Sequence, residues 1–190
     1  MDITVIAYLA LLLAVALLRI FELRVSRRNQ QQLIARGAVK VEKPPFRWVV
    51  LVHTAVLICA ALEVVFLRRP FIPLLAGVML VVFIGSNLVR LWVVRTMGQH
   101  WNVQVMNSTS LGVVTSGPFR FVRHPNYAAV FAEMLSLPLI HTAWLTAILG
   151  CFGYAAAISQ RISVEESVLL SNADYRATMA TKPRFLPGLF

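Results

Sequence analysis

The residues best suited to chemistry lie in one short run, positions 117–127, which reads GPFRFVRHPNY. Pro125 suits the first turn of a helix, because its φ angle is already helical and the N–H it lacks would be unpaired there. Arg123 and His124 therefore precede a helix N-terminus, where free N–H groups and the helix dipole attract anions. We predict that this run binds an anionic group of a ligand.

An acidic pair, Glu165 and Glu166, follows on a stretch with the pattern of a helix. One interpretation is a solvated helix face, with Arg161 and Glu165 at the favourable i, i+4 spacing. The other is functional, since a basic helix start beside an acidic pair would suit a zwitterionic cofactor with a carboxylate, an ammonium group and hydroxyls. The polar loop at 101–104, which includes Gln104, is the third piece that we expect to converge there.

The elements that must position these residues are long and apolar. Of the 190 residues, 58% are hydrophobic and only 14% are charged, whereas soluble domains average about a quarter charged. A spanning helix needs about 20 mainly apolar residues. The predicted fold class is therefore all-α, a polytopic membrane helix bundle of about five transmembrane helices with a cytoplasmic C-terminal helix forming the cofactor pocket. The candidate spans are residues 3–23, 48–66, 71–94, 127–139 and 143–158.

The formal net charge of +10 comes mainly from basic residues between the apolar spans. This placement is typical of contact with anionic membrane lipids and argues against nucleic acid as a partner. The loops after the first and third spans and the tail are basic, whereas the opposite side has only Arg68 and Arg69. The positive-inside rule then predicts an integral plasma-membrane protein with its N-terminus outside and its active site and C-terminus cytoplasmic. The first span lacks a small-residue cleavage site, so we expect it to be retained.

Polar residues inside the spans are further candidates, because they are costly in lipid and usually face the bundle interior. We expect Arg90 and Glu133 to line an internal cavity, and Glu63, near the external end, to pair with Arg68 or Arg69. An interhelical hydrogen bond is an equally good interpretation for each of them. No metal site is predicted. The full set is His53, Glu63, Ser86, Asn87, Arg90 and Glu133.

Taken in order, these motifs resemble the isoprenylcysteine carboxyl methyltransferase family, integral membrane enzymes that use S-adenosylmethionine (SAM). The resemblance rests on GPFRFVRHPNY, the Glu-Glu pair, Tyr175 and a terminal KPRFLP run, and it covers residues 97–190. The SRRN run at 26–29 and the GAV run at 37–39, with His53 and Glu63, resemble one bacterial branch more narrowly. That branch includes alkylpyrone O-methyltransferases, which act with type III polyketide synthases.

The resemblance implies a SAM pocket on the cytoplasmic side, closed by the C-terminal segment and open sideways to lipid, with S-adenosylhomocysteine as product. Arg123 would orient the acceptor oxygen, and either Lys182 or Arg184 would match the family's terminal arginine. We expect one catalytic domain over 1–190, with a three-span part at 1–96 and a SAM-binding part at 97–190. Expected cofactor contacts are Gln104, His124, Asn126, Tyr127, Glu165 and Glu166, and expected catalytic residues are Arg123, Arg184 and Arg90.

The predicted function is thus a SAM-dependent O-methyltransferase for a lipophilic acceptor that enters from the bilayer. The acceptor would be an alkylpyrone or polyketide hydroxyl, with a functional link to a type III polyketide synthase, or a prenylcysteine-like carboxylate. No dedicated base is evident in the sequence, and an acceptor that ionises near neutral pH would need none. Two alternatives stay open: a phospholipid-type N-methyltransferase, and a non-catalytic membrane subunit or transporter.

Overall fold

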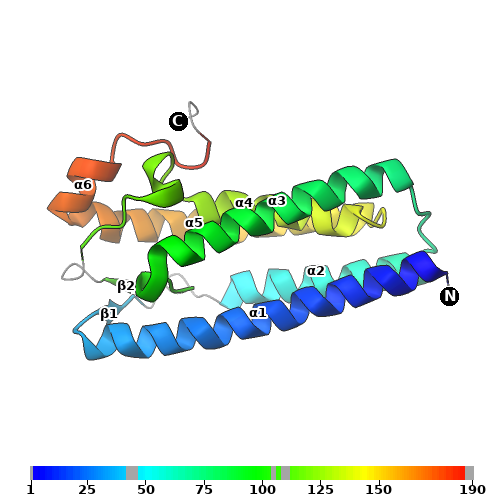
Figure 1. The fold of residues 1–190 in the computed structure, drawn as a ribbon, viewed down its shortest axis with the longest axis horizontal. Helices are drawn as coiled ribbons and strands as arrows, with labels where there is room; N and C mark the ends of the chain where they lie inside the picture. Colours follow the sequence, from blue (N-terminus) through cyan, green and yellow to red (C-terminus); the bar gives the residue numbers. More distant parts are fainter. Residues whose placement is uncertain (1, 42–46, 104–105, 108–111, 187–190) are drawn as a thin grey trace.

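A computed structural model describes residues 2–41, 47–103, 106–107 and 112–186. The described chain is a bundle of long helices, and its only described sheet has two short strands. Figure 1 shows the N-terminus and the α2–α3 turn at one end of the bundle, which we call the turn end. Strands β1 and β2 and helix α6 lie at the other end, which we call the loop end. The all-α polytopic membrane fold is therefore confirmed. The helices are α1 (Ile3–Ala35), α2 (Arg47–Phe66), α3 (Pro73–Met97), α4 (Pro125–Leu139), α5 (Trp144–Ser171) and α6 (Ala173–Met179).

Four of the described helices, α1, α2, α3 and α5, are long and apolar enough to cross a membrane. The fourth predicted span, 127–139, corresponds to α4, which begins at Pro125 as expected but has only 15 residues. At 1.5 Å per residue it is about 22 Å long, which is less than the ~30 Å hydrocarbon core. Most of α4 is buried, so the neighbouring helices shield it from lipid. The turn at 140–143 then leads into α5.

Helix α1 extends beyond its predicted span as far as Ala35. It ends in a Schellman turn, in which the Gly37 N–H donates to Ile34 O and the Ala38 N–H to Leu33 O. Gly37 has a φ of +88°, which an L residue with a side chain rarely adopts. Residues 30–35 therefore continue α1. The turn leads into β1 (Val39–Lys40), which pairs antiparallel with β2 (Met106–Asn107).

Two apolar clusters hold the bundle together. At the turn end, Tyr8 and Leu12 of α1 pack with Ala60 of α2 and Leu137 of α4. Nearer the loop end, the second cluster joins α2, α4 and α5 without α1. In that half, α1 is attached through polar groups instead: the Ser26 hydroxyl accepts the Val103 N–H, and Asn29 donates to Trp101 O. This arrangement leaves room for a cavity beside α1.

At the turn end, Glu63 of α2 caps the first turn of α5. Its carboxylate accepts the N–H groups of Leu145 and Thr146 and the Thr146 hydroxyl. Arg69 Nη2 lies 2.8 Å from the Glu63 carboxylate and neutralises it, which confirms the predicted pairing of Glu63 with Arg68 or Arg69. Glu63 therefore orients α5, the helix that carries the acidic pair at the opposite end.

Candidate active site

The Arg-His-Pro run and the C-terminal segment are joined through their backbones. The Arg123 N–H donates to Pro183 O at 2.9 Å, and the His124 N–H donates to Arg184 O at 2.8 Å. Lys182 also donates to Phe119 O, within the 3₁₀ turn Gly117–Arg120 (η3) that precedes the run. The described part of the tail thus lies against the start of α4.

The side chain of Glu166 is surrounded by two arginines and a histidine. Its carboxylate contacts Arg123 Nη1 at 3.1 Å, His124 Nε2 at 3.0 Å and Arg184 Nη2 at 2.7 Å. Hydrogen bonding to Glu166 raises the pKa of Arg184 above its ordinary value. Of the two candidates for the terminal arginine, Arg184 contacts the acidic pair, whereas Lys182 binds a backbone carbonyl. Glu166 therefore braces the tail against α4 and α5.

Glu165 belongs to a different cluster. It accepts a hydrogen bond from the Tyr127 hydroxyl, which in turn accepts one from Arg161 Nε at 2.6 Å. Arg161 Nη2 also donates to Val103 O at 2.5 Å, and Arg161 Nε lies 4.0 Å from Glu165. The expected Arg161–Glu165 pair is present, and Tyr127 joins it. The polar loop, the Arg-His-Pro run and α5 therefore converge as predicted, while Gln104 lies outside the described residues.

A cavity of about 460 Å³ opens beside these clusters, within the usual size range of small-molecule sites. Its section at the loop end is lined by the start of α4 and by residues from α5 to α6. Its other section lies deeper in the bundle, between α1 and α2. Among the described lining residues, the loop-end section includes Arg123, His124, Asn126, Tyr127, Glu165 and Tyr175, and the deeper section includes Ala16, Arg19, Glu22, His53, Leu57 and Arg90.

The loop-end section has the groups that a zwitterionic cofactor needs. Asn126 Oδ1 and Arg123 Nε are buried without a hydrogen-bond partner among the described residues, and both side chains line the cavity. They supply an acceptor for an ammonium or hydroxyl group and a donor for an anionic oxygen. Burial, and then the charge of Glu165, raise the pKa of Tyr175 to about 12, so its hydroxyl stays protonated at neutral pH. These residues fit SAM.

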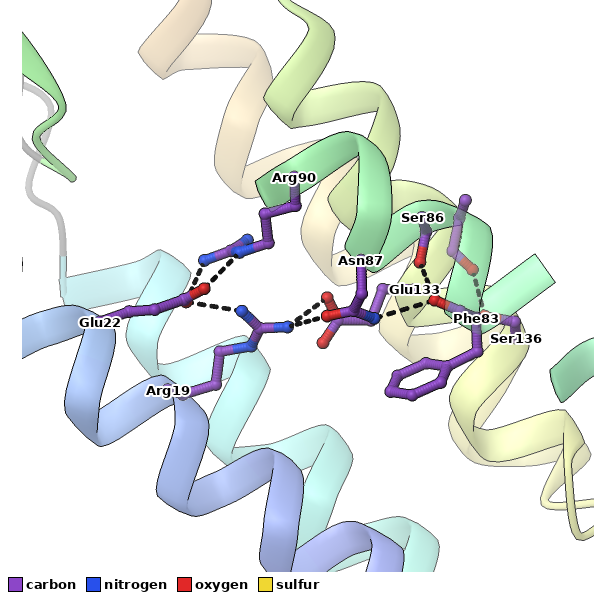
Figure 2. Close-up of polar contacts among 9 residues, drawn as sticks. Arg19, Glu22, Phe83, Ser86, Asn87, Arg90, Glu133 and Ser136 are labelled. Carbon is purple, nitrogen blue, oxygen red and sulfur yellow. Dashed lines mark hydrogen bonds and ion pairs between the residues drawn. The ribbon is translucent and has the colours of Figure 1, made fainter. Parts of the chain in front are cut away.

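The deeper section contains a buried network of charges that crosses from α1 to α3 and α4 (Figure 2). Arg90 donates to both oxygens of Glu22, at 3.0 Å and 2.6 Å. Arg19 bridges Glu22 at 2.6 Å and Glu133 at 2.7 Å and also donates to Asn87 Oδ1 at 3.0 Å. The two arginines and two glutamates cancel in formal charge, as groups at membrane depth require.

Comparison of the sequence with known protein families gives a match. The sequence model of the isoprenylcysteine carboxyl methyltransferase (ICMT) family matches residues 78–171, which include most of α3, the Arg-His-Pro run, α4 and α5. The chain belongs to the ICMT family. Membership places it among integral membrane methyltransferases, in a family that uses SAM, and it confirms the resemblance predicted from the motifs.

Relatives and a solved structure extend the likeness over most of the chain. An uncharacterized Bacillus subtilis protein, YpbQ, is 28% identical over 84% of this chain and 95% of its own length. An uncharacterized Haemophilus influenzae protein is 27% identical over 80% of this chain and 88% of its own. The structure of the eukaryotic intramembrane Ras methyltransferase ICMT superposes with a TM-score of 0.56 at 24% identity over 79% of this chain. The likeness spans 56% of that structure's length, and at this identity it shows the fold.

Within this ICMT-family fold, the predicted residues separate into two groups. Arg123, His124, Asn126, Tyr127, Glu165 and Arg90 all line the cavity. Glu166 and Arg184 are not among its described lining residues, because they bind one another beside it. Glu133, which we expected to line a cavity, is also not among them and lies against Arg19 instead.

Sequence reasoning missed Arg19 and Glu22, which lie within the first predicted span. Their spacing could have identified them, because two ionisable residues of opposite charge at i and i+3 inside a span can pair with each other and usually face the bundle interior. Arg161 was noticed only as a partner of Glu165, although it also connects Tyr127 to the polar loop.

Proposed function

We propose that this ICMT-family protein is a SAM-dependent O-methyltransferase that acts on a lipophilic acceptor in the plasma membrane. The observation that carries the proposal is that a single cavity has two chemically different sections. The loop-end section offers unsatisfied polar atoms on Asn126 and Arg123. The deeper section combines apolar residues such as Ala16 and Leu57 with a neutralised charge network. A polar cofactor and a lipophilic acceptor would meet where these sections join.

The loop-end residues would hold the cofactor. The N-terminus of α4 attracts its carboxylate, and Glu165 and Asn126 Oδ1 accept from its ammonium group or its hydroxyls. Val168 and Leu169 of α5 line the same section and give the adenine an apolar surface. When bound, SAM supplies a methyl group that its sulfonium already activates. The tail, fastened through Glu166, keeps water away from this end.

The acceptor would lie along α1 and α2, with its oxygen toward Arg123 and Arg90. Holding the oxygen in line with the methyl carbon is the main contribution required of the protein, worth up to roughly 7–11 kcal/mol in well-oriented systems. Arg90 is already paired with Glu22. It would therefore orient the acceptor oxygen without strongly stabilising the negative charge of that oxygen in the ground state. Among the catalytic residues expected from the resemblance, Arg184 would act by bracing the tail.

The apolar section favours an acceptor with a hydrocarbon chain, such as an alkylpyrone, and a type III polyketide synthase would then supply it. Basic residues at the loop end favour a cytoplasmic position for that end. The division of the chain into a three-span part at 1–96 and a SAM-binding part at 97–190 stays a prediction. The ion pair between Arg19 and Glu133 connects these two parts.

The proposal is tested with purified protein in nanodiscs and SAM carrying a radioactive methyl group. Three acceptors are compared: a long-chain 4-hydroxy-2-pyrone, a farnesylated cysteine derivative and phosphatidylethanolamine. We expect label in the methylated pyrone, and label in the prenylcysteine ester alone would reassign the substrate. Label in the phospholipid alone would indicate an N-methyltransferase. Transfer to none of them, together with no binding of S-adenosylhomocysteine, would contradict the proposal and favour a non-catalytic subunit.

A further inference from the structure

His53 of α2 is held in one tautomer. Its Nδ1 lies 2.8 Å from the carbonyl oxygen of Val49, one helical turn earlier. A carbonyl can only accept, so Nδ1 carries the hydrogen and donates it. In the neutral ring, Nε2 is then left with a lone pair and acts as an acceptor or a base.

The Nε2 atom is available to a ligand. It makes no hydrogen bond with any residue that the structure describes, and the ring lines the cavity. The ring packs edge-on against Tyr154, with centroids 5.8 Å apart. The Tyr154 hydroxyl in turn lies 3.5 Å from the backbone oxygen of Tyr127, in the first turn of α4. His53 is therefore one aromatic ring away from the Arg-His-Pro run, where the two sections of the cavity join.

The charged groups near His53 are paired with one another. Arg19 and Glu22 of α1 and Arg90 of α3 line the same cavity, and Glu133 of α4 contacts Arg19. The two positive and two negative charges cancel, and each arginine makes at least one close contact with a carboxylate. Tyr154 adds a phenol, which is neutral at ordinary pH. None of the described carboxylates bonds to His53, and Arg90 and Arg19 offset the charge of Glu133, so the network does not hold the ring as a cation.

We propose that His53 is the general base that accepts the acceptor's proton. This inference rests on the proposed O-methyltransferase activity and deepens it. As the acceptor oxygen forms its bond to the methyl carbon, its O–H bond breaks and the proton goes to Nε2. The carbon–sulfur bond breaks at the same time, and its electron pair stays on sulfur. The imidazolium then loses its proton to water through the open end of the cavity.

The base also selects a class of acceptor. A carboxylate is already ionised at neutral pH and has no proton for Nε2 to accept, so His53 would add nothing to its methylation. A weakly acidic hydroxyl, such as a phenol, gains most from a base placed beside it, and the enol of a pyrone, which ionises more readily, gains less. The structure thus points to weakly acidic hydroxyls, and not carboxylates, as the preferred acceptors.

Activity is tested with a series of long-chain phenols of increasing pKa and one long-chain carboxylate. In His53→Leu, methylation of the least acidic phenol should fall by about 10²-fold or more, and that of the carboxylate should change little. An equal loss for every acceptor would show that His53 only shapes the cavity and would overturn the inference. Affinity for S-adenosylhomocysteine checks that the variant is folded, and His53→Gln replaces it if His53→Leu is unstable.

A second measurement does not depend on turnover. A long-chain nitrophenol is bound to the cofactor-free protein and titrated with base, with its ionisation followed by absorbance. The neutral Nε2 accepts a hydrogen bond from the un-ionised phenol and so favours that form, and its loss in His53→Leu should lower the pKa of the bound phenol by about one unit. An unchanged pKa would overturn the inference even if the protein methylates phenols. Conversely, absence of methyl transfer in the wild type would contradict the proposed function, but the titration would still show whether His53 interacts with the bound phenol.

Discussion

Arg184 binds the carboxylate of Glu166 through two of its nitrogens, with Nη2 2.7 Å from Oε2 and Nε 3.1 Å from Oε1. This contact connects the tail to α5 and separates the functions of the acidic pair. Adjacent residues on a helix project about 100° apart, so Glu165 and Glu166 cannot face the same partner. Glu165 lines the cavity, whereas Glu166 binds Arg123, His124 and Arg184.

The same substitution at these two neighbours should therefore have different effects. Glu165→Gln should weaken the binding of S-adenosylhomocysteine by about tenfold or more, because a charged hydrogen bond contributes roughly 1.5–3 kcal/mol. Glu166→Gln should lower the unfolding temperature, because Arg123, His124 and Arg184 lose their anionic partner, and should change the affinity by less than about threefold. Calorimetry and thermal unfolding in nanodiscs measure both, and each variant is the control for the other. Equal loss of affinity in both would contradict the division of roles.

Arg123 can be tested with a conservative change. Arg123→Lys keeps the positive charge but loses the planar group that makes two fixed hydrogen bonds. We expect turnover of a lipophilic acceptor to fall by one to two orders of magnitude, while affinity for S-adenosylhomocysteine stays nearly constant. Full activity would mean that Arg123 serves only as a cation near lipid headgroups. A parallel loss of cofactor affinity would instead assign it to the SAM section alone.

The buried network should behave as a unit in stability measurements. Glu22→Gln leaves Arg90 without an anionic partner and should destabilise the protein by about 3 kcal/mol. The double variant Glu22→Gln/Arg90→Gln should recover part of that loss, because the uncompensated buried charge is gone. Unfolding equilibria in detergent measure the four members of the double-mutant cycle. Strictly additive losses would show that the two side chains are not coupled.

Membrane orientation can be read from cysteine labelling. After replacement of Cys59 and Cys151, a cysteine at Ser171 should react with an impermeant thiol reagent only from the cytoplasmic side. One at Pro70 should react only from outside, because that turn lies at the opposite end of the bundle and is exposed. Labelling of both positions from the same side would contradict the assignment of spans.

Much of this architecture could be predicted because it depends on local properties. Runs of apolar residues determine which segments cross the membrane, and Pro125 marks the start of α4 from its ring geometry alone. Since loops on one side of a membrane must share an end of the bundle, convergence of the Arg-His-Pro run with Glu165 and Glu166 followed from topology.

The remaining features depend on how the helices are rotated and packed. Whether Glu165 or Glu166 faces the cavity is determined by the rotation of α5, which the contacts of Tyr154 and Ile158 with α2 and α4 fix. The approach of Arg19 to Glu133 is a contact between α1 and α4, and sequence spacing does not encode it. The free Nε2 of His53 likewise follows from a side-chain rotamer and from the cavity beside it.

The central claim is that one cavity holds the cofactor at its loop end and the acceptor between α1 and α2. A crystal structure of the protein grown in a lipidic mesophase with S-adenosylhomocysteine tests this claim most directly. We predict density for the cofactor between Asn126, Glu165 and Tyr175, with its sulfur toward the section lined by His53 and Arg90. Cofactor density at any other place, or an empty cavity at saturating concentrations, would contradict the account.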